Sequence, residues 1–197
     1  MKFQNINNIW LFCLIFLLLN ACSSTKTSET SRDKSILEEV KQRGWLNCGV
    51  SGDSPGFSYV DRRDIDITQL DNEQKYLDSK INNSLVGFDV DICRAIAAAI
   101  FNDPNAVRYR LLDTKERFQE ISSGQVDVLS RTTTWTLGRD VSIKLEFAPI
   151  VFYDGQSILV RKNSEVRSLN DLNDKVICVE TETTTLGNLE DERKKRN

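Results

Sequence analysis

The chain has 197 residues, a formal net charge of −3 and no histidine. The lack of histidine excludes Ser-His-Asp triads, histidine acid–base catalysis and histidine metal sites within this chain. The slightly acidic balance indicates no nucleic-acid-binding surface. The five cysteines include no CxxC pair, so the sequence supports neither a zinc ribbon nor a thioredoxin-type motif. We therefore expect no metal, no cofactor and no nucleic-acid partner.

The N-terminus has the parts of an export signal. Lys2 is positively charged, and residues 9–19 form an unbroken run of eleven apolar residues, too short for a membrane-spanning helix of about 20. Residues 19–22 (LNAC) resemble the bacterial lipobox, in which the cysteine is acylated and becomes the first mature residue. We predict a cleaved signal peptide at 1–21 and a lipid anchor at Cys22. The alternative is an ordinary cleaved signal followed by an incidental cysteine.

A Ser/Thr-rich stretch follows the signal, and its composition predicts a flexible tether at residues 22–35. Apolar periodicity and turn residues then predict the elements of the first half. In chain order these are a helix at 36–43 ended by Gly44, a buried strand at 45–50, a turn-rich loop at 51–58, a polar excursion at 59–83, a short strand at 86–89 and a helix at 91–101 that ends at Asn102.

The second half continues the alternation of short strands and helices. The predicted elements are strands at 107–112, 126–129, 147–151, 157–160 and 176–179, a helix at 115–122 capped by Thr114 and ended by Gly124, a loop at 132–136 and a helical turn at 168–172. This order indicates an open α/β sheet. Loops that leave the carboxyl ends of strands line the ligand crevice of such a sheet, and here they are 51–58, 132–139 and 180–185.

The cysteines leave two alternatives open. Cys13 departs with the signal and Cys22 carries the lipid, so Cys48, Cys93 and Cys178 remain. An exported protein meets oxidising conditions, which permits a disulfide between the first two of these. The interpretation that we favour from sequence is that all three are small buried apolar residues.

Five blocks of sequence resemble the family 3 extracytoplasmic solute-binding proteins of polar amino acid ABC transporters, and most of all their general L-amino acid branch. The blocks are CGVSGDSPGFS (48–58), GFDVDICRAIAAAIF (87–101), RFQEISSGQVDVLSRTTTWTLGRD (117–140), FYDGQSILVRK (152–162) and KVICVETETTT (175–185). The resemblance implies the type 2 periplasmic-binding-protein fold, with two α/β lobes joined by crossover strands. It predicts lobe one at 36–150 and the hinge crossing with the start of lobe two at 151–197.

A buried carboxylate needs a guanidinium or several N–H donors, and arginine offers a planar fork for both oxygens. Arg131, Arg139 and Arg161 are the candidates, and the aligned motif implies that Arg139 binds the ligand carboxylate. We expect Arg131 and Arg161 to serve structure or solubility. The resemblance implies further contacts from Thr132, Thr134 and Thr183 to the carboxylate region, and from Ser51 and Phe57 to the amine and side chain.

The sequence departs from the family pattern at three places. The 59–83 stretch is longer than the connection expected there, and Glu182 stands where the family pattern predicts a glycine. The chain ends at Asn197, before the rest of lobe two and before the acidic residue that usually binds the ligand ammonium. We therefore expect a truncated product that keeps lobe one and the start of lobe two.

The predicted function is capture of a free L-amino acid for an ABC importer. The implied protein is a monomer outside the cytoplasm, anchored to the membrane by lipid, that works with a permease and is not an enzyme. One alternative is a remnant, or a sensor or interaction lobe, that binds no ligand. Another is an enzyme on the same fold, similar to cyclohexadienyl dehydratase, although the chain has no obvious pair of catalytic carboxylates.

Overall fold

The computed structural model describes residues 35–60, 79–143 and 145–196. The predicted signal peptide, Cys22, nearly all of the tether and most of the 59–83 excursion lie outside the described residues. The described residues from 36 to 196 belong to one compact unit.

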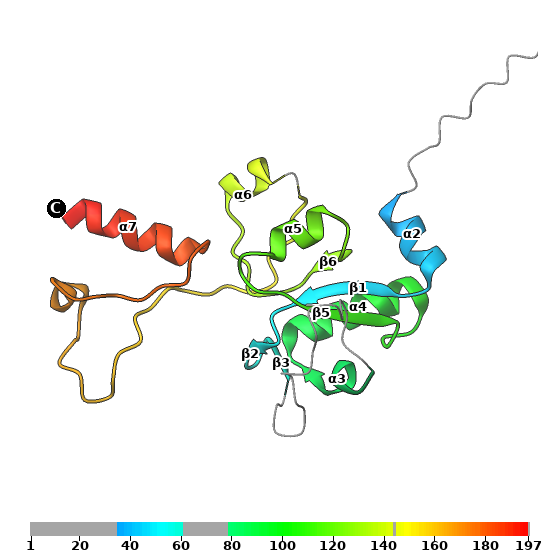
Figure 1. The fold of residues 1–197 in the computed structure, drawn as a ribbon, viewed down its shortest axis with the longest axis horizontal. Coiled ribbons are helices and arrows are strands. Elements are labelled where there is room, and N and C mark those ends of the chain that lie inside the picture. The colour runs from blue at the N-terminus through cyan, green and yellow to red at the C-terminus, as the bar shows by residue number, and fades with distance from the viewer. Residues whose placement is uncertain (1–34, 61–78, 144, 197) are drawn as a thin grey trace, which may run out of the picture. The chain divides into compact units, whose positions relative to one another are not determined.

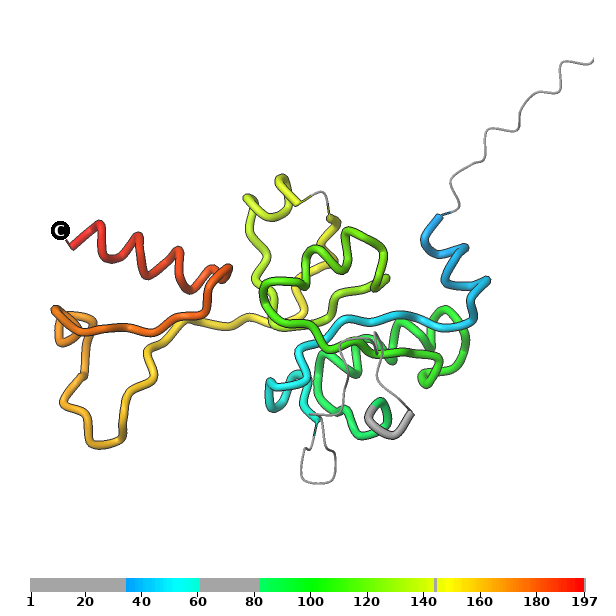
Figure 2. Tube along the Cα trace, viewed as in Figure 1, coloured from blue at the N-terminus to red at the C-terminus, as the bar shows by residue number. Residues whose placement is uncertain are grey.

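Three parallel strands form the central sheet (Figure 1). Strand β1 (Leu46–Val50) lies between β5 (Val107–Leu111) and β6 (Val128–Leu129). β1 pairs with β5 along its whole length, and Figure 2 shows the two traces running side by side. All five residues of β1 are buried, as expected for the central strand of a parallel sheet. The predicted strands at 45–50 and 107–112 are therefore confirmed, whereas that at 126–129 is confirmed in part, because only Val128 and Leu129 form a strand and both are half-buried.

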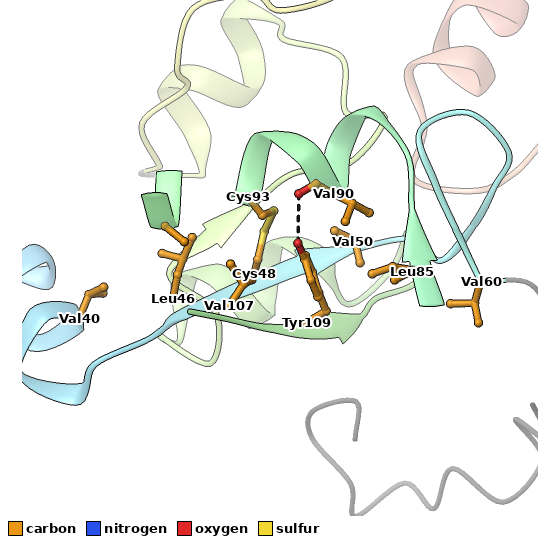
Figure 3. Packing of buried hydrophobic residues seen from close by; sticks show 11 residues of the cluster. Val40, Leu46, Cys48, Val50, Val60, Leu85, Val90, Cys93, Val107 and Tyr109 are labelled. Carbon is orange, nitrogen blue, oxygen red and sulfur yellow. Dashed lines mark hydrogen bonds between the residues drawn. A yellow bond between two sulfur atoms is a disulfide. The ribbon is translucent and has the colours of Figure 1, made fainter. Parts of the chain in front are cut away.

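Helix α4 (Phe88–Phe101) provides the main packing face against this sheet. It buries Val90, Cys93 and Ala97, which share one face of a helix. The helix ends at Asn102, whose left-handed backbone lets its N–H donate to the Ala98 carbonyl at 2.8 Å. Figure 3 shows the buried cluster between α4 and β1, with the Tyr109 hydroxyl donating to the Val90 carbonyl at 3.0 Å.

A second, antiparallel sheet contains β2 (Asp53–Ser54), β3 (Ser58–Val60) and β4 (Leu85–Val86). The predicted 51–58 loop is thus partly a hairpin. The strand expected at 86–89 is wrong for residues 88 and 89, which are helical because α4 begins at Phe88, and the strand itself is Leu85–Val86. Gly87 joins β4 to α4 with φ 128°, and a Cβ there would lie 2.3 Å from the Phe57 carbonyl oxygen. Only glycine fits this crossing.

The remaining helices are short or lie outside the core. Helix α2 (Ile36–Arg43) ends at Gly44, as predicted, with Gly44 at φ 88°. The others are α3 (Ser79–Ser84), α5 (Arg117–Ser122), α6 (Leu137–Ser142), the 3₁₀ turn η3 (Leu169–Leu172) and α7 (Thr184–Arg196). The helical turn predicted at 168–172 is confirmed, with Ser168 and Asp171 forming a capping box. In the described part of the chain, no helix has the length and apolar character needed to cross a bilayer.

Three predicted strands are wrong. Residues 147–151, 157–160 and 176–179 are irregular, and no residue of 145–196 is buried. None of the apolar residues of these segments is buried, and Leu159 and Val176 are 99% and 94% exposed. A strand needs a neighbouring strand for its backbone hydrogen bonds and an apolar surface for its inward face, and no described segment supplies either to these residues.

The favoured interpretation of the cysteines is also wrong. Cys48 of β1 and Cys93 of α4 form a disulfide across the core, and Cys178 is exposed. The spacing of these residues along the chain contains no information on their proximity, which arises only when α4 packs on β1. The disulfide that the sequence left open is therefore the observed arrangement.

Candidate functional site

The site lies where the two outer strands of the central sheet end. β5 leads into Thr114 and helix α5, and β6 leads into residues 130–136. Because carboxyl ends of parallel strands lie at one edge of a sheet, these two connections approach each other. A local turn sets the first connection: Asp113 Oδ1 accepts from the N–H groups of Lys115 (2.7 Å) and Glu116 (2.9 Å). This turn, rather than the predicted Thr114 cap, leads into α5.

A pocket of about 200 Å³ is lined by these connections and by the segment that begins α7. Its lining is almost entirely polar and combines three guanidinium groups with six threonines and one carboxylate. The lining residues are Thr114, Arg117, Arg131, Thr132, Thr134, Arg139, Glu180, Thr183, Thr184 and Thr185. Such a lining suits a small charged molecule better than an apolar one.

Arg139 is held in place from two sides. Thr136 caps α6 by accepting from the Arg139 N–H at 3.1 Å, which fixes the backbone. The guanidinium donates to the Thr134 carbonyl at 2.8 Å and to the Glu182 carbonyl at 3.3 Å, and its Cζ lies 5.2 Å from the centroid of the Phe118 ring. These contacts bridge the loop after β6 and the segment before α7.

Arg117, which is not among the site residues expected from the sequence, is the most buried of the three arginines, at 3% exposed. It donates to the same Glu182 carbonyl at 3.3 Å and packs on Phe118, with Cζ 4.8 Å from the ring centroid. Its Nε is buried without a hydrogen-bond partner, as are Nε and Nη1 of Arg131. Arg131, expected to serve structure or solubility, thus lies in the pocket with unused donors.

The 180–185 segment completes the pocket. The Thr114 hydroxyl donates to the Glu180 carboxylate, and Thr183 Oγ1 donates to the Glu180 carbonyl at 2.7 Å. Thr183 Oγ1 also accepts from the Leu186 N–H at 3.2 Å and so caps α7. The Thr184 hydroxyl donates to Thr134 Oγ1 at 3.2 Å, which joins the segment to the loop after β6.

The pocket is positively charged and partly desolvated. The pKa of Arg117 is lowered to about 10, chiefly by burial and also by the nearby charges of Arg131 and Arg139, while Glu180 and Glu182 oppose the shift. Burial also lowers the pKa of Arg139. Arginine stays protonated at neutral pH even so, and the gathered like charges favour the binding of an anion.

The structure brings together four of the six ligand-contact residues expected from the sequence, namely Thr132, Thr134, Arg139 and Thr183. Ser51 and Phe57 do not line this pocket. The Ser51 hydroxyl lies 2.8 Å from that of Ser58 and donates to that of Ser54, and Phe57 makes edge contacts with Phe88 and Phe152. Arg161 is exposed and also lies outside the lining.

The described residues offer no grouping of three or more His, Cys, Asp or Glu side chains that could hold a metal ion. The chemistry that the pocket does offer is recognition of acid groups. Guanidinium forks and threonine hydroxyls surround a small space, and the first residues of α7 face it. The N–H groups of a first helical turn have no acceptor within the helix and carry the positive end of its dipole.

Comparison with known proteins agrees with this chemistry. A general L-amino acid-binding periplasmic protein, AapJ of Rhizobium johnstonii, is 40% identical over 163 residues, which cover 83% of this chain and 42% of that protein. The glutamate/glutamine/aspartate/asparagine-binding protein BztA of Rhodobacter capsulatus is 40% identical over 157 residues, covering 80% of this chain and 41% of that protein. The chain thus spans about two fifths of the length of these relatives.

A solved structure supports the same relationship. An ABC transporter periplasmic binding protein from Brucella ovis with glutathione bound is 41% identical, with a TM-score of 0.64 over 79% of this chain and 43% of that one. The type 2 periplasmic-binding-protein fold expected from the sequence is confirmed. The sequence model of one protein family, the bacterial extracellular solute-binding proteins, family 3, matches residues 70–192, which are more than half of the chain. The chain therefore belongs to the family 3 bacterial extracellular solute-binding proteins.

Proposed function

We propose that this chain is an extracytoplasmic solute-binding component of an ABC importer and holds a free L-amino acid by its α-carboxylate. The observation that carries the proposal is the set of contacts around Arg139. Its guanidinium is fixed by the Thr134 and Glu182 carbonyls at the edge of a small polar pocket. The named relatives are binding proteins for amino acids, and the proposal is binding without catalysis.

In this proposal each pocket element has a distinct task. Arg139 offers a planar donor pair to the two carboxylate oxygens. The hydroxyls of Thr132 and Thr134 contact the same group from the loop after β6. Thr183 and the first N–H groups of α7 contact it from the opposite segment. Ser51 and Phe57 lie outside the pocket, so we assign them no part in the carboxylate contact.

The core disulfide supports a location outside the cytoplasm. The Cys48–Cys93 bond joins two fully buried residues, and such bonds form and persist in oxidising compartments. We further propose that the signal at 1–21 directs export and that Cys22 is acylated, so that the protein stays near a membrane permease. Labelling with radioactive palmitate in bacteria tests this anchor. The Cys22→Ser variant should lose the label, and a variant that keeps it contradicts acylation at this residue.

Isothermal titration calorimetry tests the binding function. The full-length chain, solubilised in mild non-ionic detergent, is titrated with each of the twenty common L-amino acids. At least one should bind with a Kd below about 1 mM, equivalent to roughly −4 kcal/mol. Arg139→Ala should weaken that binding by about tenfold to a hundredfold, because charge-assisted hydrogen bonds contribute about 1.5–3 kcal/mol.

The matched control is Arg161→Ala, which removes the same side chain from an exposed position outside the pocket. It should leave every Kd unchanged. Absence of binding by all twenty ligands would contradict the proposed function. Equal losses in the two variants would contradict the assignment of Arg139.

A further inference from the structure

The pocket holds more cationic groups than one α-carboxylate can use. A single guanidinium fork satisfies both oxygens of a carboxylate, and the proposed function assigns that task to Arg139. Arg117 and Arg131 line the same cavity. Throughout the described part of the chain, no carboxylate forms an ion pair with any of these three arginines within 4.0 Å. Two guanidinium groups are therefore left without an anionic partner.

The unused donors lie inside the protein, where an unmade hydrogen bond costs most. Arg131 has Nε and Nη1 buried without partners, and Arg117 has Nε in the same condition. Water cannot satisfy donors that it does not reach, and buried polar groups in native proteins are nearly always paired. Repulsion among the three like charges adds to this cost. An additional anion would accept hydrogen bonds from the unused donors and would reduce the repulsion among the arginines.

The nearby carboxylates do not fill this need. Asp113, whose charge interacts with that of Arg131, uses Oδ1 to accept from the Lys115 and Glu116 N–H groups. Glu180 accepts from the Thr114 hydroxyl, and Glu182 reaches Arg117 and Arg139 through its backbone carbonyl. Asp89 at the start of α4 is close enough to Arg131 for its charge to be felt, but Asp89 Oδ2 is itself buried without a hydrogen-bond partner. If Arg131 served only as the counter-ion of Asp89, Nε or Nη1 of Arg131 would be expected to donate a hydrogen bond to Asp89 Oδ2.

We infer that the ligand carries a second acid group and that Arg131, supported by Arg117, binds it. The inference rests on the proposed function and names its substrate class: an amino acid with an acidic side chain, such as L-glutamate. The α-carboxylate binds to Arg139, and the side-chain carboxylate accepts hydrogen bonds from Nε and Nη1 of Arg131. Arg117 lies deeper, on Phe118, and adds positive charge behind the second carboxylate.

L-Glutamate and L-glutamine test this inference because they have nearly the same shape and differ in the second charge. Calorimetry of the full-length chain at pH 7.5 should give a Kd for glutamate at least tenfold lower than that for glutamine. In Arg131→Gln the preference should fall to about threefold or less, mainly through weaker glutamate binding. Arg161→Gln, an exposed position outside the pocket, should keep the full preference.

Salt supplies a second measurement that needs no variant. Raising NaCl from 50 to 500 mM should weaken glutamate binding more than glutamine binding, because only glutamate carries the second charge. This result keeps the inference testable even if Arg131→Gln does not fold.

The outcomes separate the inference from the proposed function. Glutamine bound as tightly as glutamate, or a neutral amino acid bound while glutamate is not, would overturn the acidic second group and leave amino acid capture standing. An unchanged glutamate preference in Arg131→Gln would overturn the role of that residue. Failure of all twenty amino acids to bind would overturn the proposed function, and the inference with it.

Discussion

Residues 36–130 and residues 145–196 both contain short apolar segments, yet only the first region buries them. In the first, β1 is buried along its length, α4 covers it, and a disulfide joins the two. In the second, no residue is buried, and Leu159 and Val176 face solvent. The pocket is lined by residues between 114 and 139, which lead out of the packed sheet, and by residues between 180 and 185, which lie at the start of α7 in the second region.

The difference teaches that a strand-like sequence is not sufficient for a strand. Val107 and Val176 have the same side chain and both stand in apolar stretches, but Val107 pairs with Leu46 of β1 and Val176 pairs with no described strand. Burial of apolar area contributes about 25 cal/mol per Å², and only a packed neighbour supplies it. The first region should therefore provide most of the free energy of unfolding. Ligand binding should slow amide exchange in the pocket segment of the second region.

The largest effect should follow removal of the disulfide. Cys48 and Cys93 are 45 positions apart, and closing a loop of that length lowers the entropy of the unfolded chain by an amount worth about 4 kcal/mol. The Cys48→Ala/Cys93→Ala variant should lose about that much free energy of unfolding, measured by urea denaturation. Cys178→Ala is the control, because that cysteine is exposed and free. Equal stability of the two variants would contradict a structural disulfide.

A pair of leucine substitutions tests the comparison itself. Leu46→Ala, at a position 1% exposed in β1, should cost about 3 kcal/mol through lost burial and a residual cavity. Leu159→Ala, at a position 99% exposed, should change the free energy of unfolding by less than about 0.5 kcal/mol. Both are measured by thermal and urea unfolding. A large effect at Leu159 would show that the second region has a packed core of its own.

Asp89→Asn should stabilise the packed region in a pH-dependent manner. Asp89 is 5% exposed, and burial raises the pKa of its carboxyl from 3.8 to about 6, although the charge of Arg131 opposes this shift. The ionised carboxyl therefore costs folding free energy above pH 6, and protonation removes that cost as the pH falls from 6 to about 4.

A pKa difference of two units corresponds to roughly 3 kcal/mol, and loss of the favourable charge in the first turn of α4 subtracts up to about 1 kcal/mol. Asp89→Asn should thus be about 1–2 kcal/mol more stable than the wild type at pH 7.5, with the gain vanishing by pH 4. Urea unfolding across this range measures it, with exposed Asp140→Asn as the control. A gain that grows toward low pH has the wrong sign for this account.

The smallest effect concerns Glu182 in the second region. Its backbone adopts φ 60°, a left-handed conformation that costs a residue with a Cβ about 1 kcal/mol more than glycine. Glu182→Gly should therefore raise the free energy of unfolding by about 1 kcal/mol, measured by urea denaturation. It should also tighten glutamate binding by about threefold in calorimetry, because it removes a negative charge beside the arginines. Glu182→Gln removes the charge alone and should give the same gain in binding without the gain in stability. Weaker binding by both variants would argue against the effect of the charge, and an unchanged stability of the Gly variant would argue against the strain.

The sequence predicts the packed region well because its evidence is local. The apolar run at 45–50, the alanine-rich helix ended by Asn102 and the stop at Gly44 each depend on a few neighbouring residues, and all three are confirmed. Glu182 is likewise readable, because it stands where glycine was expected and does have a left-handed backbone.

The features that the sequence did not predict are long-range. Arg117 looks like an ordinary helix residue until α5 is placed beside the loop after β6, where it lines the pocket. The one local signal for it is its place at the start of the helix that follows the turn at Asp113 and Thr114, after a strand that ends at the crevice. The Cys48–Cys93 bond has no such local signal, because it depends on the packing of α4 against β1.

Hydrogen–deuterium exchange with and without L-glutamate tests most directly whether ligand joins the two sides of the pocket. The full-length chain is compared in the absence and in the presence of saturating glutamate, and peptides are followed by mass spectrometry. We predict slower exchange in residues 131–134 and 183–186 together, with no change in β1, whose amides are already protected in the packed sheet. Unchanged exchange in both pocket segments, or protection confined to the turn around Phe57, would contradict the account.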